Sequence, residues 1–289
     1  MIFLSIIIPS YQSEKTLPRL LDSINRESGG PACRQADMEV IVVEDGEHNK
    51  KLETYNLKQR YEKLRLKTII SKKLQVISYK LKVNRGPAYA RNFGARKARG
   101  EVLLFLDSDV VVLPGTIREV EKIFKEDKYK VAVTGVWDKK QISNKFFPKF
   151  KALRDWSYWI NERKADSYYY LFSTRIAAIR RDVFLKEKGF NENYRGADVE
   201  DIEFTYRLAR KYRIDFNDKM RVHHEFEDFW PVAKKYFKRA YQWIGIYQSR
   251  KKFDPVATTG SEAITTVSAV GLVGSLFLLI IFVLILNFF

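Results

Sequence analysis

Residues 101–109 read EVLLFLDSD, an uninterrupted apolar run that ends in two carboxylates separated by one serine. An apolar run without polar alternation is typical of a strand that is covered on both faces, as in a parallel sheet. The helix-prone stretch 88–99 precedes it, and Gly100 supplies the end of that helix. We therefore predict a buried strand that delivers Asp107 and Asp109 to one edge of a sheet.

The same alternation of apolar strand and helix recurs along the chain, although the aromatic-rich region 131–181 is less regular. Such alternation implies an α/β domain with a parallel sheet, whose ligands bind beyond the carboxyl ends of the strands. Besides 101–106, the predicted strands are 2–8, 39–43 and 75–83, and the predicted helices are 17–24, 50–67, 88–99, 200–212 and 231–252.

The composition excludes several classes of protein. The chain has 289 residues, is 46% hydrophobic, and carries 52 Lys and Arg against 35 Asp and Glu. These values exclude a disordered tail, a collagen-like repeat and a disulfide-stapled miniprotein. The single Cys33 cannot form an intramolecular disulfide, which favours a reducing compartment.

The C-terminal segment contains no charged residue from 263 to 289 and is rich in Leu, Ile, Val and Phe. As a helix it would be about 40 Å long, enough to cross a hydrocarbon core of about 30 Å once. We therefore predict one transmembrane helix within 259–289. A buried core helix is the alternative.

The preceding segment, 231–252, has an amphipathic pattern in which every charged residue is basic. Such a helix is expected to lie among anionic headgroups, which makes anionic lipids a predicted partner. The position of the basic residues then predicts a single-pass membrane protein with its folded domain on the cytoplasmic face. A solvated helix packed on the domain is the alternative. The predicted organisation is a catalytic domain at 1–228, a juxtamembrane helix and linker at 229–258, and the membrane segment.

Two acidic clusters follow predicted strands. Asp107 and Asp109 offer hard oxygen ligands for Mg²⁺ or Mn²⁺, and such a metal would neutralise a diphosphate. Glu44 and Asp45 end an earlier strand, where a carboxylate can accept hydrogen bonds from a nucleobase or ribose. Taken singly, the first cluster is equally a solvated loop, and Asp45 with Gly46 is equally a turn.

Other charged groups lie at predicted helix starts. Arg91, in the helix that opens after Asn84 and Gly86, can hold phosphate oxygens. Glu200 and Asp201 can provide a general base for an acceptor hydroxyl, or they can simply favour the helix dipole.

Taken together and in order, these segments resemble the inverting family-two nucleotide-sugar glycosyltransferases. The likeness spans roughly residues 2–224. The matching segments are IIIPSY 6–11, VVEDG 42–46, NRG 84–86, ARNFG 90–94, FLDSD 105–109, AIRR 178–181, GFNE 189–192, ED 200–201 with Arg207, and VHH 222–224.

The resemblance implies the Rossmann-like, mostly parallel GT-A fold of nucleotide-diphospho-sugar transferases. It implies that Asp201 is the catalytic base, with Glu200 beside it on the acceptor side. It implies an Mn²⁺ or Mg²⁺ ion held by Asp107, Asp109 and His224, the last matching the family pattern better than His223. The implied nucleotide-sugar-binding residues are Pro9, Tyr11, Glu44, Asp45, Asn84, Gly86, Arg91, Asp107 and Asp109.

The implied reaction is a single displacement that inverts the anomeric carbon. The acceptor is expected to be a hydroxyl of a lipid-linked glycan or glycolipid, with a polyprenyl phosphate as the alternative. The Gln-x-x-Arg-Trp motif of processive synthases is absent from 239–243, so one sugar is expected per encounter. A nucleotidyltransferase and a non-catalytic basic membrane scaffold are the alternatives from other classes. Nucleic acid is not an expected partner, because the densest basic stretch adjoins the apolar C-terminal segment.

Overall fold

The computed structural model describes residues 2–28, 38–46, 75–162, 170–194, 196, 199–251 and 260–286. It divides into two compact units, Met1–Gln242 and Trp243–Phe289. The helix predicted at 50–67 lies outside the described residues, and the domain boundaries after 228 and 258 stay predictions.

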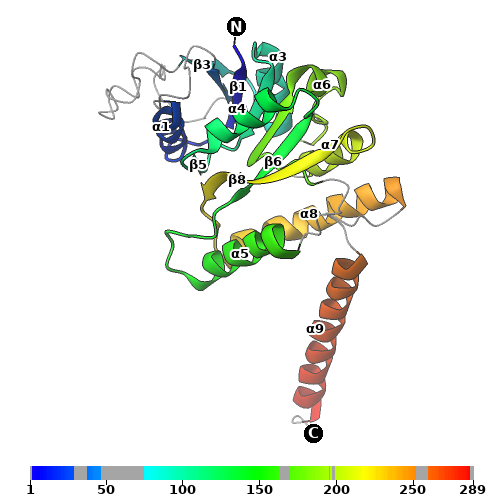
Figure 1. The fold of residues 1–289 in the computed structure, drawn as a ribbon. Helices are drawn as coiled ribbons and strands as arrows, with labels where there is room; N and C mark the ends of the chain where they lie inside the picture. Colours follow the sequence, from blue (N-terminus) through cyan, green and yellow to red (C-terminus); the bar gives the residue numbers. More distant parts are fainter. Residues whose placement is uncertain are drawn as a thin grey trace. The chain divides into compact units, whose positions relative to one another are not determined.

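The first unit is built on one eight-stranded sheet with the order β3-β2-β1-β4-β7-β6-β8-β5 (Figure 1). The strands are β1 (Leu4–Ser10), β2 (Met38–Glu44), β3 (Gln75–Lys80), β4 (Val102–Leu106), β5 (Val110–Val112), β6 (Ala132–Trp137), β7 (Ile176–Arg180) and β8 (Ile214–His224).

The four strands β3, β2, β1 and β4 are all parallel, as predicted. Every residue of β1 and β4 is buried, which explains why both read as continuous apolar runs. Their carboxyl ends, together with that of β2, meet at one edge of the sheet. The acidic clusters that follow β2 and β4 are therefore brought to the same edge.

The sheet is mostly parallel, as predicted, but the half that contains β7, β6, β8 and β5 is mixed. Strand β7 is antiparallel to both β4 and β6, and β5 is antiparallel to β8, whereas β6 and β8 are parallel. Strands β6 and β7 lie in the irregular region 131–181, where strand–helix alternation gives no prediction of strand direction. Strands β4 and β7 are neighbours, but β5, α4, β6 and α5 separate them along the chain.

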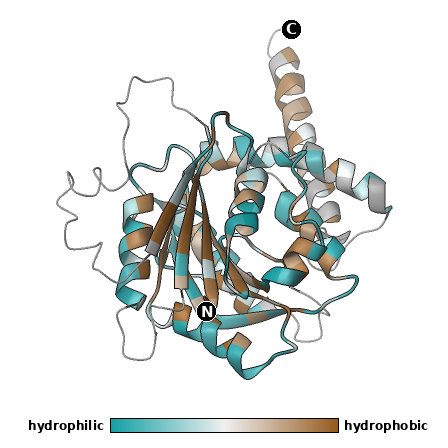
Figure 2. Cartoon of the chain, turned by 90° about the horizontal axis from the view of Figure 1, so that it is seen from above, coloured by the Kyte–Doolittle hydropathy of each residue, from teal (hydrophilic) through white to brown (hydrophobic). Residues whose placement is uncertain are grey.

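Helices flank the sheet of the first unit, whose strands are coloured largely hydrophobic in Figure 2. Pro87 is the first residue of α3, as its fixed φ favours. The helices are α1 (Leu17–Ser28), α3 (Pro87–Lys97), α4 (Thr116–Glu126), α5 (Phe146–Ser157), the π-helical turn η3 (Tyr158–Glu162), α6 (Arg181–Lys186), α7 (Glu200–Leu208), α8 (Phe229–Arg250) and α9 (Gly260–Leu286).

Aromatic side chains of the irregular region fill the core. Trp159 is buried edge-on against Trp137, with ring centroids 5.7 Å apart, and Tyr170 stacks on Phe216 at 5.2 Å. A second aromatic cluster packs Phe105 of β4 against the segments around α6 and α7. Its other members are Phe172, Phe184, Phe190 and Phe204.

The second unit contains α9, which is 27 residues long. Within the described residues, no helix combines the length and apolar character that a membrane crossing requires. The transmembrane helix predicted within 259–289 is thus not found.

Candidate active site

The site lies at the sheet edge where β1, β2 and β4 end. Strand β4 stops at Leu106, and Asp107, Ser108 and Asp109 lead directly into β5. The hydroxyl oxygens of Ser108 and Ser13 are 2.6 Å apart, so the acidic turn is tied to the loop that follows β1. This contact fixes the turn between the two aspartates against the first loop of the domain.

Asp45 organises the loop opposite. Its buried carboxylate accepts hydrogen bonds from the backbone N–H groups of Arg85 at 2.8 Å and Gly86 at 2.7 Å. Burial raises the pKa of Asp45, and these two hydrogen bonds oppose that effect. Gly46 has φ +92, and a Cβ there would lie 2.6 Å from the backbone nitrogen of Asn84. Asp45 was predicted to contact the nucleoside, and its observed contacts position the loop at 84–86.

The other predicted donor-binding residues surround this loop. Glu44 is the last residue of β2 and half-buried, and Tyr11 is exposed just after β1. Asn84 is exposed, and its side-chain oxygen accepts a hydrogen bond from Gly86. Pro9 is a buried member of β1, the strand that ends at this edge. Tyr11, Glu44 and Asn84 therefore lie at the same end of the sheet, where β1, β2 and β3 end.

Arg91 joins the two halves of the site. It was predicted to bind phosphate, but its buried guanidinium donates to Asp107 at 2.7 Å and to Glu200 at 2.8 Å. Glu200 is itself buried, at the start of α7. One cation from α3 thus links the acidic turn after β4 to the acidic pair of α7.

Replacing Arg91 by methionine is expected to destabilise the protein strongly, because Asp107 and the buried Glu200 lose the cation between them. Removing one partner of a buried ion pair costs about 3–5 kcal/mol, or about 6–20 °C in Tm for a domain of this size. Thermal unfolding measures this shift. The matched control is Arg96→Met on the same helix, whose pair with Glu192 is exposed and is expected to contribute at most about 1 kcal/mol. Equal Tm values for the two variants would contradict the bridging role.

Asp109 and His224 meet because β5 and β8 are antiparallel. The register places Val110 opposite His224, and His224 Nε2 lies 3.5 Å from Asp109 Oδ2. Burial alone would raise the pKa of Asp109, but His224 and Arg175 outweigh it and hold this pKa below its usual value. His223 instead contacts Glu225 at 2.6 Å. The geometry therefore favours His224 over His223 as the partner of the acidic turn.

Asp109 and His224 suit a divalent ion that is completed by substrate. His224 Nε2 and Asp109 Oδ2 lie 3.5 Å apart, somewhat wider than the roughly 3.0 Å between adjacent octahedral ligands that are each about 2.1 Å from one ion. Mg²⁺ usually takes one or two carboxylates, substrate phosphates and water. In the part of the chain that the structure describes, no three His, Cys, Asp or Glu side chains gather into a metal site. Asp107, predicted as a third ligand, is held by Arg91.

Asp201 has the electrostatics of a general base. It lies in the first turn of α7, and one carboxylate oxygen accepts a hydrogen bond from the N–H of Ile202. Burial and the neighbouring charge of Glu200 raise the pKa of Asp201 to about 7, against the opposing charges of Arg91, Arg175 and Arg239. A carboxylate with such a pKa is matched to accepting a proton near neutral pH.

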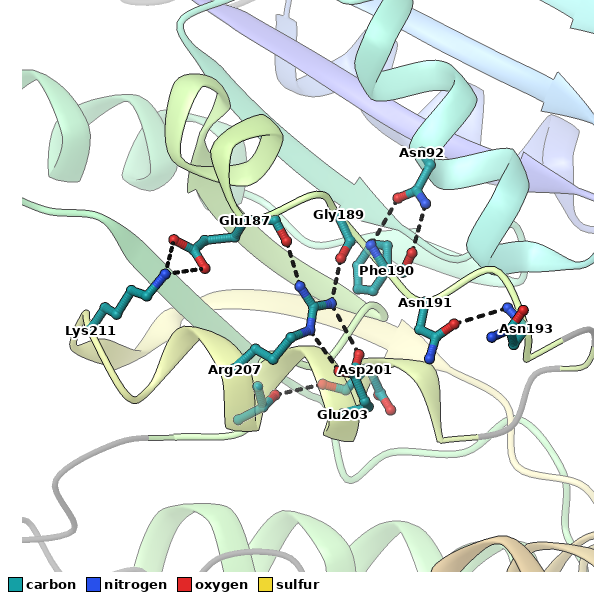
Figure 3. Close-up of polar contacts among 11 residues, drawn as sticks. Asn92, Glu187, Gly189, Phe190, Asn191, Asn193, Asp201, Glu203, Arg207 and Lys211 are labelled. Atoms are coloured by element: carbon teal, nitrogen blue, oxygen red, sulfur yellow. Dashed lines mark hydrogen bonds and ion pairs between the residues drawn. The ribbon is translucent and has the colours of Figure 1, made fainter. Parts of the chain in front are cut away.

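A polar network holds the helix that carries Asp201 (Figure 3). Arg207 of α7 donates to the carbonyl oxygens of Glu187 and Gly189 and to the Glu203 carboxylate. From α3, the Asn92 side chain both donates to and accepts from the backbone of Phe190. Gly189 has φ +61, and a Cβ there would lie 2.3 Å from the Asn92 oxygen. Residues 187–190, which follow α6, are therefore held from both α3 and α7.

Arg175 is a site residue that the sequence motifs missed. Leu106 lies opposite Ile176 in the β4–β7 register, which puts Arg175 at the level of Asp107. Its guanidinium lies 4.9 Å from the Trp137 ring centroid, and within the described ranges it forms no hydrogen bond or ion pair. Burial raises the pKa values of Asp109 and Asp201, and the positive charge of Arg175 lowers both pKa values. Only the strand register reveals this position.

Arg239 of α8 was predicted to face lipid headgroups. It is half-buried, and its charge opposes the raised pKa of Asp201. The amphipathic sequence pattern of α8 does not show which of its basic residues lie near the site and which face outward. The contact of this helix with lipid headgroups stays a prediction, and Arg239 is the basic residue of the helix whose charge acts on Asp201.

Comparison with known proteins gives a family match, curated relatives and solved structures. The model of the family described as Glycosyl transferase family 2 matches residues 5–187. A validoxylamine A glucosyltransferase of Streptomyces hygroscopicus subsp. limoneus is 26% identical over 235 residues, which cover 71% of this chain and 47% of that protein. The matched regions cover 33 to 47% of the length of the first curated relatives.

Two solved structures share the fold. Staphylococcus aureus TarS 1–349 in complex with UDP-GlcNAc gives a TM-score of 0.56 at 23% identity, covering 79% of this chain and 59% of that one. The mannosyltransferase PcManGT of Pyrobaculum calidifontis, in complex with GDP-Man and Mn²⁺, gives a TM-score of 0.56 at 18% identity, covering 78% and 57%.

Proposed function

The chain belongs to glycosyl transferase family 2, and from that premise we propose that it transfers one sugar from a nucleotide-diphosphate sugar to a hydroxyl group with inversion. The observation that carries the proposal is the Arg91 bridge between Asp107 and Glu200. It fixes the acidic turn after β4 next to a carboxylate, Asp201, whose pKa is raised to about 7. Donor-binding and base-forming groups are thus held in one site.

The donor nucleoside is assigned to the loops after β1, β2 and β3. Asp45 holds the loop at 84–86 in place, while Tyr11 and Glu44 lie at the adjoining strand ends. A carboxylate at a strand end can accept hydrogen bonds from a base or ribose. We therefore assign the contact with the nucleoside to Glu44, whereas Asp45 positions the loop at 84–86.

The diphosphate is assigned to the acidic turn after β4. Mn²⁺ or Mg²⁺ held by Asp109 and His224 would neutralise charge that develops on the departing diphosphate. Arg175 adds a guanidinium at the level of Asp107, and guanidinium groups bind phosphate oxygens in a bidentate geometry. Arg207 donates to backbone carbonyl groups and Arg91 donates to carboxylates, so we assign the donor phosphates to Arg175.

Asp201 takes the proton of the acceptor hydroxyl as that oxygen attacks the anomeric carbon. The C–O bond to the diphosphate breaks as the new C–O bond forms, so the configuration inverts in one displacement. Because a polyprenyl phosphate would need no base, the raised pKa of Asp201 favours a hydroxyl acceptor.

Replacing Arg175 by glutamine is expected to raise the Michaelis constant for the donor and to move the acidic limb of the pH profile upward. Arg175 stabilises the ionised form of Asp201, so its loss raises the pKa of the base above about 7. Activity then requires a higher pH, because the base must be deprotonated to act. The measurement is kcat/KM across the neutral range, with Arg175→Lys restoring part of both effects. An unchanged midpoint would contradict the assignment.

We assign the acceptor to the membrane, as a lipid-linked glycan or glycolipid. Two features support association with the cytoplasmic face: the charged residues of 231–252 are all basic, and α9 exposes apolar side chains along its length, such as Leu276, Phe277 and Phe282. Basic residues contribute about 1 kcal/mol each near an anionic surface. Co-sedimentation of the full chain with anionic and neutral vesicles tests this association.

The function is tested by incubating the full chain with a panel of nucleotide sugars, a divalent metal and a membrane lipid extract. The products are separated by chromatography. Release of nucleoside diphosphate that depends on the lipid extract is expected. Release of pyrophosphate would instead indicate a nucleotidyltransferase, and salt-sensitive binding of DNA without any donor turnover would indicate a basic scaffold.

A further inference from the structure

Helix α5 turns an apolar stripe outward. Phe146, Phe150 and Leu153 are 80%, 51% and 52% exposed, and their spacing of four and three residues places them on one side of the helix. Pro148 and Ala152, on the other side, are buried. A helix on a water-exposed surface normally has the reverse arrangement, with polar residues outward. We call Phe146, Phe150 and Leu153 the outer stripe of α5.

The outer stripe belongs to a well-anchored helix. On the inner side, Lys151 pairs with Asp155 at 2.8 Å and donates to the Tyr236 hydroxyl of α8 at 3.0 Å. On the outer side, the rings of Phe146 and Phe150 stack at 5.8 Å with an interplanar angle of 13°. The apolar residues are therefore presented to the outside by a fixed element.

The apolar surface continues onto the start of α8, which lies beside α5 (Figure 1). Phe147 packs edge-on against Phe229 with ring centroids 5.3 Å apart, and Phe229 contacts Trp230 at 5.1 Å. Phe229 and Trp230 are 48% and 73% exposed. Clustered exposed apolar side chains mark an interaction surface, whereas scattered ones do not.

Basic side chains border the stripe on both sides. At 3.6 residues per turn, Lys149 flanks Phe146 and Phe150 on one side of the helix and Arg154 flanks them on the other. Both are exposed. Residues 138–157 contain six Lys and Arg against two Asp. Long basic side chains beside an apolar stripe can extend toward phosphates while the stripe enters the apolar layer.

We propose that the outer stripe of α5, with Phe229 and Trp230, docks on an anionic phospholipid surface. The occupant follows from the charge: a bilayer with anionic headgroups complements the flanking cations. A second copy of the chain would bring the same basic residues together, since a two-fold contact pairs each patch with itself. The inference rests on the membrane association proposed above and assigns the surface that makes it.

A fluorophore on the stripe tests the proposal in the full chain. Phe150→Cys in a Cys33→Ser background is labelled with the polarity-sensitive dye NBD and mixed with vesicles of phosphatidylcholine and phosphatidylglycerol. We expect a blue-shifted, several-fold stronger emission that lipids carrying a quencher in the acyl chain suppress. The matched control is Tyr129→Cys. Tyr129 is 94% exposed and precedes the first residue of β6, whereas α5 follows the last residue of that strand. Its label is expected to stay in water.

Three outcomes would overturn the proposal. If the protein sediments with vesicles but the label at position 150 stays in water, membrane association stands and the assigned surface is wrong. If the protein does not sediment with vesicles, both are wrong. If emission rises with protein concentration in the absence of lipid, the stripe binds a second copy. None of these readings depends on sugar transfer, so failure of the enzymatic assay is a separate result.

Discussion

Replacing Asp201 by asparagine is expected to lower kcat by about 10²–10⁴-fold, the usual contribution of a positioned general base. Asparagine keeps the shape of the side chain but cannot accept the hydroxyl proton. Asp201 lies on α7 and is assigned to the acceptor, so the affinity for the nucleoside diphosphate is expected to stay the same. Steady-state kinetics measure the first effect, and calorimetric titration with the nucleoside diphosphate measures the second.

Folding of this variant is checked by its stability. The folded-state pKa of Asp201 is raised to about 7. Ionisation of Asp201 therefore lowers the stability of the fold as the pH rises from the unfolded-state pKa of this group to its folded-state pKa. Above pH 7 the asparagine variant is therefore expected to be at least as stable as the wild type. Glu126→Gln, at an exposed position near the end of α4, is the matched control. Retention of full kcat by Asp201→Asn would remove this residue from the chemistry.

The second large effect is expected for Asp109→Ala. This change removes the carboxylate that, with His224, is assigned to a divalent ion and the diphosphate. Loss of such electrostatic stabilisation typically costs about 10²–10³ in kcat. Binding is also expected to change, because the affinity for nucleoside diphosphate should lose its dependence on Mn²⁺. Calorimetric titration with and without Mn²⁺ reads this effect independently of turnover.

Asp218→Ala provides the control for this variant, since Asp218 is exposed on the strand that carries His224. It is expected to bind nucleoside diphosphate like the wild type, with the same Mn²⁺ dependence. If Asp109→Ala kept a Mn²⁺-dependent affinity equal to that of the control, the ion would have to bind elsewhere.

The parallel half of the sheet was predictable because its signals are local. Each buried strand reads as an apolar run, and the acidic pairs follow directly where those runs end. Parallel packing then brings Glu44 and Asp107 to one edge. The family resemblance rested partly on these segments, and the match over residues 5–187 confirms that the chain belongs to the family.

The mixed half was not predictable from such signals. The direction of β7 depends on long-range pairing with β4 and β6, and no local pattern encodes it. Arg175 enters the site only through that pairing, which explains why no motif marked it. The antiparallel pairing of β5 with β8 likewise decides which of the two histidines faces Asp109.

Individual roles were harder to predict than positions. Asp45 and Arg91 lie where the motifs place them, but their observed partners are backbone N–H groups and two carboxylates. The sequence shows which charged residues are present, but the partner of each one depends on segments that are far away along the chain. The exposed stripe of α5 was not predicted, because it lies in the irregular region 131–181 and its exposure depends on how the helix packs on the domain.

The stereochemistry of the product tests the central claim most directly. With a donor of known anomeric configuration and its acceptor, ¹H NMR of the freshly formed product reports the configuration of the new glycosidic bond. A single displacement with Asp201 as base predicts inversion, so an α-linked donor gives a β-linked product. A product that retains the configuration of the donor would contradict the mechanism.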